Sequence, residues 1–389
     1  MANNNKHTGP NVPALRFPEF SGEWETLQLA DLASFSKDRV KIETLSTDNY
    51  VSTENMQQDF AGIKEAISLP SSSTAVEFQI GDILISNIRP YLRKIWMADR
   101  NGGCSTDVLS LRTRNEKVDS AFLYCCLAND GFISYVMSGA KGVKMPRGDK
   151  QHISSFSLGV PSIKEQKKIS KLISLLEKRI STQSKIIEDL TTLRSALCEK
   201  CSTQTGDIYD LSAILQEVDE RSTVVNQYQV LSSTVKGIFS QKEYFNKDIA
   251  SEDNKGYKVV RRGHIVLSPQ NLWMGNINYN GRFDIGIVSP SYKVYSIKEG
   301  FNPIFVASLL RTKKALYEYM LASEQGASIV RRNLNVEAFM SIRFRIPEIR
   351  QQDSLSMAIA SINAKINNEK SVLELLTKQK FSLLENMFI

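Results

Sequence analysis

The chain contains one short phrase twice, and this repeat limits the possible folds more than any other feature of the sequence. "VPSIKEQKKI" begins at Val160, and "IPEIRQQDSL" begins 186 positions later at Ile346. After each copy, apolar residues recur at steps of four and three, the spacing of a coiled-coil seam. The predicted seam residues are Ile169, Ile173, Leu176, Ile180, Ile187, Leu190 and Leu197 in the first copy and Leu355, Ile359, Ile362, Ile366, Leu373, Leu376 and Leu383 in the second.

Each copy predicts a long helix. Pro161 and Pro347 stand at the helix starts, where proline is tolerated, and no Gly or Pro lies between Glu165 and Lys200 or after Pro347. A helix of roughly 36 residues is about 54 Å long. A single amphipathic helix would carry a similar apolar stripe on its own. Two copies with the same interruptions are best explained as helices that pack on each other.

The interruptions of the seam indicate the direction of the pair. Arg194 and Lys380 occupy equivalent positions, so a parallel pair would bring two cations to the same level, which is unfavourable. In an antiparallel pair each lies near one end, opposite Ile359 or Ile173, where its stem covers apolar surface and its charge reaches water. The pattern therefore predicts an antiparallel coiled coil.

Composition and length indicate a folded protein of two or three domains. Of 389 residues, 42% are hydrophobic and 23% charged, so the chain can bury a sizeable core. No apolar run is long enough to span a membrane, and the opening "MANNNKHTGP" is too polar for a signal peptide. We therefore expect a cytoplasmic protein with no membrane partner.

The cysteines predict neither disulfides nor a metal site. The chain has five cysteines, an odd number, and Cys198 and Cys201 form a C-x-x-C without a second pair at zinc-site spacing. The three histidines lie far from this pair in sequence. We expect ordinary buried or half-buried thiols.

The segments before the two long helices resemble each other more weakly. Each contains a buried-strand signal after a glycine, "GDILIS" from Gly81 and "GHIVLS" from Gly263. Each ends in a basic loop that begins at Gly139 or Gly326 and is followed by a strand that leads into the helix. One helix is predicted in each half, "DSAFLYCCLAN" and "IFVASLLRT". The fold class is therefore α+β, with one α/β domain present twice and a pseudo-twofold axis if the helices are antiparallel.

No catalytic residue is predicted. The sequence lacks the G-x-x-x-x-G-K-[ST] phosphate loop and a G-x-G-x-x-G that opens a helix after a strand. "SPSY" from Ser289 comes near a motif of amino-methyltransferases, but Ser291 replaces a proline and no glycine-rich cofactor loop precedes it. ATP and S-adenosylmethionine binding therefore lack their usual signatures.

Clustered basic charge is the stronger signal. The net charge of +7 is mild, but cations gather at corresponding places in the two halves. Such clusters are often only solvated faces, whereas their recurrence favours contact with DNA phosphates. The candidate DNA-binding residues are Arg89, Arg93, Lys94, Lys141, Lys144, Arg147, Lys150, Arg261, Arg262, Arg331 and Arg332.

Several phrases carry a family resemblance. "VPALRFPEFSGEW", from Val12 to Trp24, is similar to the start common among specificity subunits of type I restriction-modification systems, and the two repeated phrases look like the starts of their conserved helices. "YVSTENM" from Tyr50, "GDILIS" and "GIVSPSY" from Gly286 resemble recurring phrases of their target recognition domains. The resemblance covers essentially the whole chain. In "GHIVLS", His264 stands where the family usually has an acid.

The resemblance implies a domain plan. Target recognition domains are expected at residues 1–159 and 204–345, and the conserved helices that form the spacer at residues 160–203 and 346–389. Each recognition domain would read one half of a split double-stranded DNA target, and the antiparallel helices would set the gap between the halves. The chain itself would be non-catalytic and hold no cofactor or metal. Methyltransferase (M) subunits and restriction (R) subunits would be its partners and would carry S-adenosylmethionine, ATP and Mg²⁺.

Two other classes of function stay open at this point. The chain could be a self-contained DNA modification enzyme whose motifs are unrecognised. It could also be a coiled-coil scaffold without sequence-specific DNA binding, in which the basic loops are solvated faces.

Overall fold

The fold consists of two compact units. The structure, a computed structural model, describes residues 11–114, 116–201, 206–245, 253–325 and 332–389. The first unit comprises Met1–Gln183 and Val372–Ile389, and the second comprises Ser184–Ser371. Each unit has a main hydrophobic core of its own, to which both long helices contribute: Ile169 and Leu383 pack in the first core, and Cys201 and Ile359 in the second. In each unit, the residues outside the long helices are called its head.

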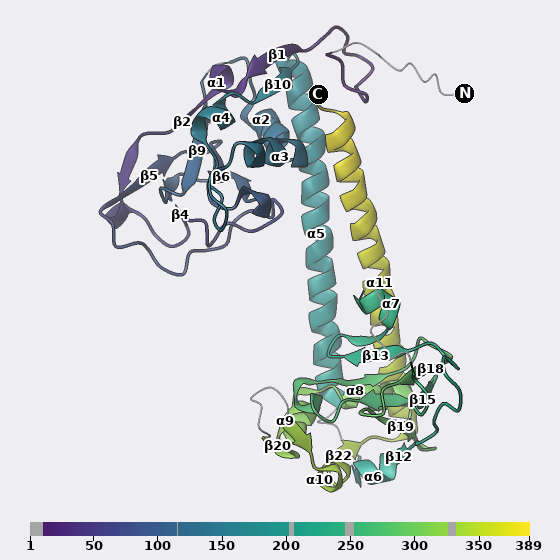
Figure 1. The fold of residues 1–389 in the computed structure, drawn as a ribbon. Coiled ribbons are helices and arrows are strands. Elements are labelled where there is room, and N and C mark those ends of the chain that lie inside the picture. Colours follow the sequence, from purple (N-terminus) through teal and green to yellow (C-terminus); the bar gives the residue numbers. More distant parts are fainter. Residues whose placement is uncertain (1–10, 115, 202–205, 246–252, 326–331) are drawn as a thin grey trace, which may run out of the picture. The chain divides into compact units, whose positions relative to one another are not determined.

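Two long helices confirm the main sequence prediction. Helix α5 spans Ile163–Cys201 with 39 residues, and α11 spans Ile349–Asn386 with 38 residues. Figure 1 shows them side by side within each unit. Each predicted seam residue is buried or half-buried.

The helices run antiparallel in each unit, as predicted. In unit 1, Lys380 Nζ lies 2.6 Å from Glu177 Oε1, and Ile173 and Leu384 share one apolar cluster. In unit 2, Arg194 Nη1 donates to Asn363 Oδ1 at 3.2 Å. From the sequence, the Lys380 ammonium was expected to reach solvent. It instead pairs with Glu177, because the antiparallel register brings that carboxylate within reach of the side chain.

The described residues of the unit 1 head form two four-stranded sheets and four short helices. Figure 1 labels most of these elements. A further strand pair joins the beginning of this head to the segment that leads into α5. One sheet has the order β2-β9-β6-β7, and the other has the order β3-β5-β8-β4, in which only β4 and β8 pair in parallel. The strands are β1 (Glu25–Gln28), β2 (Ala33–Phe35), β3 (Arg39–Lys41), β4 (Tyr50–Val51), β5 (Thr74–Phe78), β6 (Ile83–Ser86), β7 (Ile95–Met97), β8 (Gly102–Cys104), β9 (Val108–Thr113) and β10 (Ser157–Val160), with β1 pairing with β10. The helices are α1 (Leu29–Leu32), α2 (Ser120–Leu127), α3 (Asp130–Ser138) and α4 (Lys150–Ser154), with 3-10 turns at Ile42–Thr44 and Pro90–Leu92.

The head of unit 2 repeats the first sheet with the same strand order, β12-β19-β16-β17. The pair β11 (Asp207–Asp210) and β22 (Arg343–Ile346) corresponds to β1 and β10. The sheet strands are β12 (Leu215–Glu217), β16 (Ile265–Leu267), β17 (Ile277–Tyr279) and β19 (Lys293–Ile297), and the helices are α6 (Leu211–Ile214), α7 (Gln241–Phe245), α8 (Pro303–Leu309), α9 (Lys313–Leu321) and α10 (Val336–Met340), with a 3-10 turn at Leu272–Met274. Two strand pairs take the place of the second sheet, β13 (Leu231–Thr234) with β14 (Gly237–Ser240) and β15 (Lys258–Arg261) with β18 (Ile285–Val288). A further pair, β20 (Ser323–Gln325) with β21 (Arg332–Leu334), follows α9.

In each head, two consecutive helices lie in the region where the sequence predicted a single helix. The predicted segments form α2 and α8, and α3 and α9 follow them after a very short break. The break is short because Asn129 and Thr312 cap the next helix at once: their side chains accept hydrogen bonds from Phe132 N and Ala315 N.

A buried glutamine explains the repeated phrase. Gln166 Nε2 donates to Pro161 O and Lys117 O, both at 2.8 Å, and its Oε1 accepts from Asp119 N at 2.8 Å. Asp119 is the N-cap of α2, so one side chain ties the first turn of α5 to the start of a head helix.

Unit 2 makes the same connection. Gln352 Nε2 donates to Pro347 O at 2.8 Å, and its Oε1 accepts from the backbone of Asn302, the N-cap of α8, at 2.9 Å. Ser356 adds a hydrogen bond to the Asn302 side chain at 2.7 Å. The phrase therefore recurs because each head is fastened to its long helix by the same hydrogen bonds.

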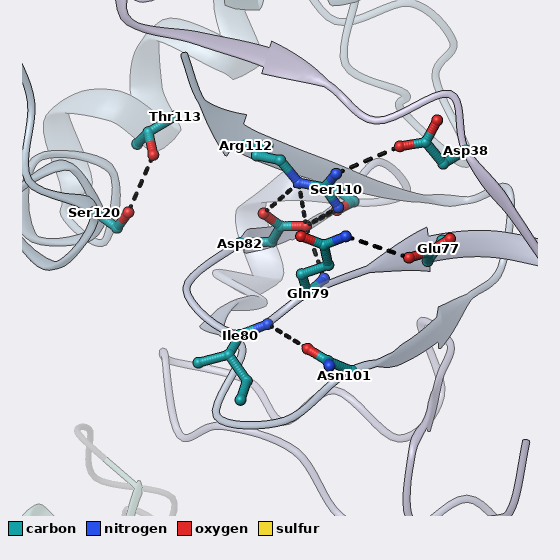
Figure 2. Close-up of polar contacts among 10 residues, drawn as sticks. All are labelled: Asp38, Glu77, Gln79, Ile80, Asp82, Asn101, Ser110, Arg112, Thr113 and Ser120. Carbon is teal, nitrogen blue, oxygen red and sulfur yellow. Dashed lines mark hydrogen bonds and ion pairs between the residues drawn. The ribbon is translucent and has the colours of Figure 1, made fainter. Parts of the chain in front are cut away.

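The turn before β6 and the turn before β16 contain the same hydrogen bond, although its side-chain acceptor changes from Asp82 to His264. In unit 1, Asp82 Oδ2 accepts from Gln79 N at 2.9 Å, and Arg112 Nη2 donates to the same oxygen at 2.8 Å (Figure 2). In unit 2, His264 Nδ1 accepts from Arg261 N at 3.2 Å. The imidazole nitrogen thus takes the place of the carboxylate at the turn before the strand.

Candidate nucleic-acid interface

Two basic segments that lie far apart in the sequence meet in unit 1. Residues 87–94 follow β6, and residues 141–150 form the basic loop that leads into α4. Arg89 N donates to Pro146 O at 2.8 Å, and Gly148 N donates to Asn87 O at 3.1 Å. These two segments together are called the unit 1 loop junction. The sequence predicted both clusters but not their contact.

Some cations of this junction are paired with carboxylates. Arg93 lies 3.1 Å from Asp130 and 3.5 Å from Asp59. Lys141 pairs with Asp149 at 2.6 Å, and Arg147 pairs with Asp107 at 2.9 Å. Lys94 Nζ donates to a backbone oxygen, that of Thr53, at 2.6 Å. Their charge is therefore partly compensated within the protein.

The other cations of the junction point to solvent without a carboxylate partner among the described residues. Arg89, Lys144 and Lys150 are exposed, and the Lys150 ammonium lies 5.7 Å from the centre of the Phe35 ring. Tyr91, two residues after Arg89 in the 3-10 turn, is 48% exposed, so the same segment carries an exposed ring and an exposed cation. This combination suits a nucleic-acid strand, because cations bind phosphates and rings stack on bases.

The backbone at Arg89 holds a conformation that costs energy. Arg89 and Arg93 have φ angles of 50° and 54°, in the left-handed region that residues other than glycine rarely adopt. They flank the 3-10 turn Pro90–Leu92. Strained backbone of this kind is concentrated at functional sites, which supports a role for this turn.

The N-cap of α4 anchors the basic loop. Asp149 accepts hydrogen bonds from Gln151 N and His152 N and pairs with Lys141. The Lys141 ammonium and these amides lower the pKa of the Asp149 carboxyl to about 2. The carboxylate therefore stays charged at any pH near neutral and keeps the end of the loop in place.

Unit 2 contains a similar contact, between the segment after β16 and the first residue of β21. Arg332 N donates to Gln270 O at 3.2 Å, in the segment that follows β16. The Arg332 guanidinium lies 4.8 Å from the ring of Trp273, within the 3-10 turn. Residues 270–275 and Arg332 are called the unit 2 loop junction. Arg331, also predicted as a DNA-binding residue, lies outside the described residues.

Arg261 and Arg262 are placed differently. They come before β16, whereas the unit 2 loop junction comes after it. Arg261 pairs with Glu220 and Arg262 with Asp284, each at 2.7 Å. The structure therefore places these two predicted cations away from the junction and already compensated.

Sequence reasoning did not identify Trp273 as a site residue. It lies 182 positions after Tyr91, the same offset that separates β6 from β16 and the two 3-10 turns. Applying that offset to Tyr91 would have found it. Its stacking on Arg332 could not be seen, because the two residues are far apart in the sequence.

The thiols are placed as expected. Cys104, Cys125, Cys126 and Cys201 are buried and Cys198 is half-buried, all as free thiols. Burial raises the pKa of Cys104 to about 12, which keeps this thiol protonated. Among the described residues, no three His, Cys, Asp or Glu side chains are grouped to hold a metal ion. No helix in the same part of the chain is long and apolar enough to cross a membrane.

Comparison with known proteins identifies relatives along the chain. Residues 21–192 match the family model of the type I restriction modification DNA specificity domain. The chain is 21% identical, over 411 aligned residues, to the type I restriction enzyme MjaVIII specificity subunit of Methanocaldococcus jannaschii, with 94% of this chain and 91% of that protein covered. It is 24% identical over 186 residues to the type I restriction enzyme EcoDI specificity subunit of Escherichia coli, covering 45% and 41% of the two chains.

Solved structures share the fold. The S subunit of a type I restriction-modification system from M. genitalium superposes with a TM-score of 0.61 at 13% identity, covering 97% of this chain and 99% of that one. A chain from a structural study of complex assembly and conformational transition of the type I R-M system gives a TM-score of 0.55 at 14% identity, covering 94% and 97%. Residues 21–192 therefore match a DNA specificity domain of type I restriction-modification systems, and along most of its length the chain is similar to a specificity subunit of such a system.

Proposed function

We propose that this chain is the non-catalytic, DNA-reading subunit of a type I restriction-modification complex. Residues 1–159 and 204–345 each read one half of a split double-stranded DNA target, and the helices in residues 160–203 and 346–389 set the gap between the halves. The chain directs methyltransferase and restriction subunits to this target. Those partners supply S-adenosylmethionine, ATP and Mg²⁺, and the complex works in the cytoplasm.

The observation that carries this proposal is the loop junction that occurs in both units. In unit 1 the segment after β6 meets residues 141–150, and in unit 2 the segment after β16 meets Arg332 at the start of β21. Each segment carries an aromatic residue: Tyr91 follows Arg89 by two residues, and the Trp273 ring lies 4.8 Å from the Arg332 guanidinium. Two equivalent charged surfaces on one chain suit a target with two parts.

Methylation sequencing tests the proposal in a host that carries this protein and its methyltransferase partner. We expect modified adenines or cytosines within a motif that has two specified halves and an unspecified gap. Since a spacer helix of roughly 36 residues is about 54 Å long, the centres of the halves should lie roughly one to one and a half turns of DNA apart. A single continuous motif would contradict the proposal.

Two further measurements separate the other classes of function. The purified chain with S-adenosylmethionine and duplex DNA should transfer no methyl group, whereas a self-contained modification enzyme would. With the methyltransferase present, binding to duplex DNA should weaken steeply as salt rises, which a scaffold without a DNA role would not show.

A further inference from the structure

A pocket in unit 2 is lined by positively charged side chains. Its volume is about 800 Å³, and it is bordered by α5, α8, β17, the β13–β14 turn and α11. Its described lining includes Arg194, Lys236, Arg311 and Lys313, against one acid, Glu199. The Glu199 carboxylate already accepts a hydrogen bond from Lys313 N at 2.7 Å.

Neutral groups hold the guanidinium of Arg311 in the pocket. Its Nη1 donates to Asn278 Oδ1 at 2.6 Å, and its Nη2 donates to Val235 O at 2.9 Å. Asn278 is itself buried and donates to Ser233 Oγ and Thr234 O, both at 2.8 Å. The guanidinium is therefore fixed in position without a carboxylate, and N–H donors remain for a ligand.

Arg194 is held in the same manner. It is half-buried on α5, and its only hydrogen bond to a described side chain is to the neutral amide of Asn363. The protein around Arg311 lowers the pKa of that guanidinium, first by desolvation and then through the positive charge of Arg194. Two cations that disfavour each other gain stability if an anion lies between them.

Unit 1 provides a comparison within the same chain. The residues 186 positions from Arg194 and Asn363 are Lys380 and Glu177, which form an ion pair at 2.6 Å. Arg311 directly precedes the N-cap of α9, and the residue that directly precedes the N-cap of α3 is Ala128. Unit 1 thus has a carboxylate where unit 2 has an amide, and an alanine where unit 2 has an arginine.

We propose that this unit 2 pocket is an anion site for a phosphate group, bound by Arg194 and Arg311. A planar guanidinium binds phosphate oxygens through paired N–H donors, and two guanidiniums can bind different oxygens of one phosphate group. The phosphate is either a free phosphate or a phosphodiester of DNA. The inference goes beyond the proposed function, since binding of free phosphate requires no DNA reading.

Substitution of Asn363 tests the site in the full-length chain. Asn363→Glu places beside Arg194 the carboxylate that unit 1 has at Glu177, so the fold should tolerate it. Arg311→Gln removes the second cation. Asn368→Glu, on an exposed position of the same helix, is the matched control. Titration calorimetry with inorganic phosphate, at ionic strength held constant with chloride, should show binding that both pocket variants weaken about tenfold or more and the control leaves unchanged.

Binding to duplex DNA identifies the source of the phosphate. If Asn363→Glu also lowers DNA affinity while Asn368→Glu does not, the pocket holds a backbone phosphate. If only the binding of inorganic phosphate is lost, the ligand is a free phosphate. The proposal is overturned if inorganic phosphate binds wild type and Asn363→Glu equally. It is also overturned if wild type binds no phosphate and Asn363→Glu binds DNA as wild type does. Thermal unfolding in chloride confirms that each variant is folded.

Discussion

At the scale of single residues, the two units conserve hydrogen bonds where they do not conserve residue types. His264 Nδ1 accepts a hydrogen bond from the backbone amide three residues earlier, as the Asp82 carboxylate does in unit 1. An imidazole can accept this bond only when the nitrogen is unprotonated. Desolvation lowers the pKa of His264, and the nearby charge of Arg261 lowers it further. The neutral form is therefore the one that the fold stabilises.

The lowered pKa of His264 predicts that the stability of unit 2 depends on pH. The pKa of His264 in the folded state lies below the unfolded value of about 6.5. The contribution of the neutral imidazole to the free energy of unfolding is therefore fully present above about pH 6.5 and is lost as pH falls through the folded pKa. His264→Asp should make the free energy of unfolding less sensitive to acidification. Urea unfolding at about pH 7.5 and about pH 5.5 checks this. An equal loss of stability in wild type and variant would contradict it.

The buried glutamines give a second prediction at this scale. Gln352→Ala leaves the Asn302 amide and the Pro347 carbonyl without their partner, so it should lower the free energy of unfolding by about 1–3 kcal/mol. Gln166→Ala should cost about as much or more, since it makes three such bonds. Gln351→Ala is the matched control: the residue is the exposed neighbour of Gln352, and its loss should change stability by less than about 0.5 kcal/mol. Denaturant titration measures all three. Similar losses for Gln351→Ala and Gln352→Ala would show that the connection contributes nothing specific.

At the scale of elements, the N-terminal segment is tied to the start of α5 by a buried ion pair. Arg16 Nε and Nη2 donate to the two oxygens of Glu165 at 2.7 and 2.8 Å, and the side chains are 8% and 1% exposed. The residue equivalent to Glu165 in unit 2 is Gln351, where no such arginine approaches among the described residues. The repeated phrase therefore differs at this position because only its first copy receives the N-terminal segment.

Removing the arginine should destabilise unit 1 strongly. Arg16→Ala leaves the Glu165 carboxylate buried and unpaired, which typically costs about 3–5 kcal/mol. Hydrogen exchange of the α2 and α5 amides should accelerate accordingly. Adding Glu165→Gln, which copies unit 2, should restore part of the loss because it removes the uncompensated charge. A double variant as unstable as Arg16→Ala alone would refute this explanation.

The elements that the sequence predicted are those whose signals are local. The helices follow from periodic apolar residues and the absence of Gly and Pro, and the strands after Gly81 and Gly263 follow from short apolar runs. The direction of the helix pair was predicted correctly from Arg194 and Lys380, although the Glu177 partner was missed. Glu177 lies outside the apolar pattern, so a periodicity argument assigns it no role.

The candidate site was predictable only in part, for a physical reason. The cations of both basic segments are visible in the sequence, but the contact of residues 87–94 with residues 141–150 depends on strand pairing across the sheet. Whether a cation is free depends on long-range partners too. Arg262 and Arg89 look alike in sequence, yet only Arg262 meets a carboxylate, that of Asp284.

At the scale of the whole molecule, DNA affinity should follow the free cations and not the total charge. Each Lys or Arg that neutralises a phosphate contributes about 0.9 to the slope of log affinity against log salt. The double variant Arg89→Gln and Lys144→Gln should therefore reduce the slope by about 1.8 when the full chain binds duplex DNA with its methyltransferase partner. The double variant Arg261→Gln and Arg262→Gln removes the same formal charge from residues that already pair with Glu220 and Asp284, so it should change the slope far less. Fluorescence anisotropy across a salt series measures both slopes. If the two variants reduced the slope equally, net charge would explain binding and the unit 1 loop junction would have no special role.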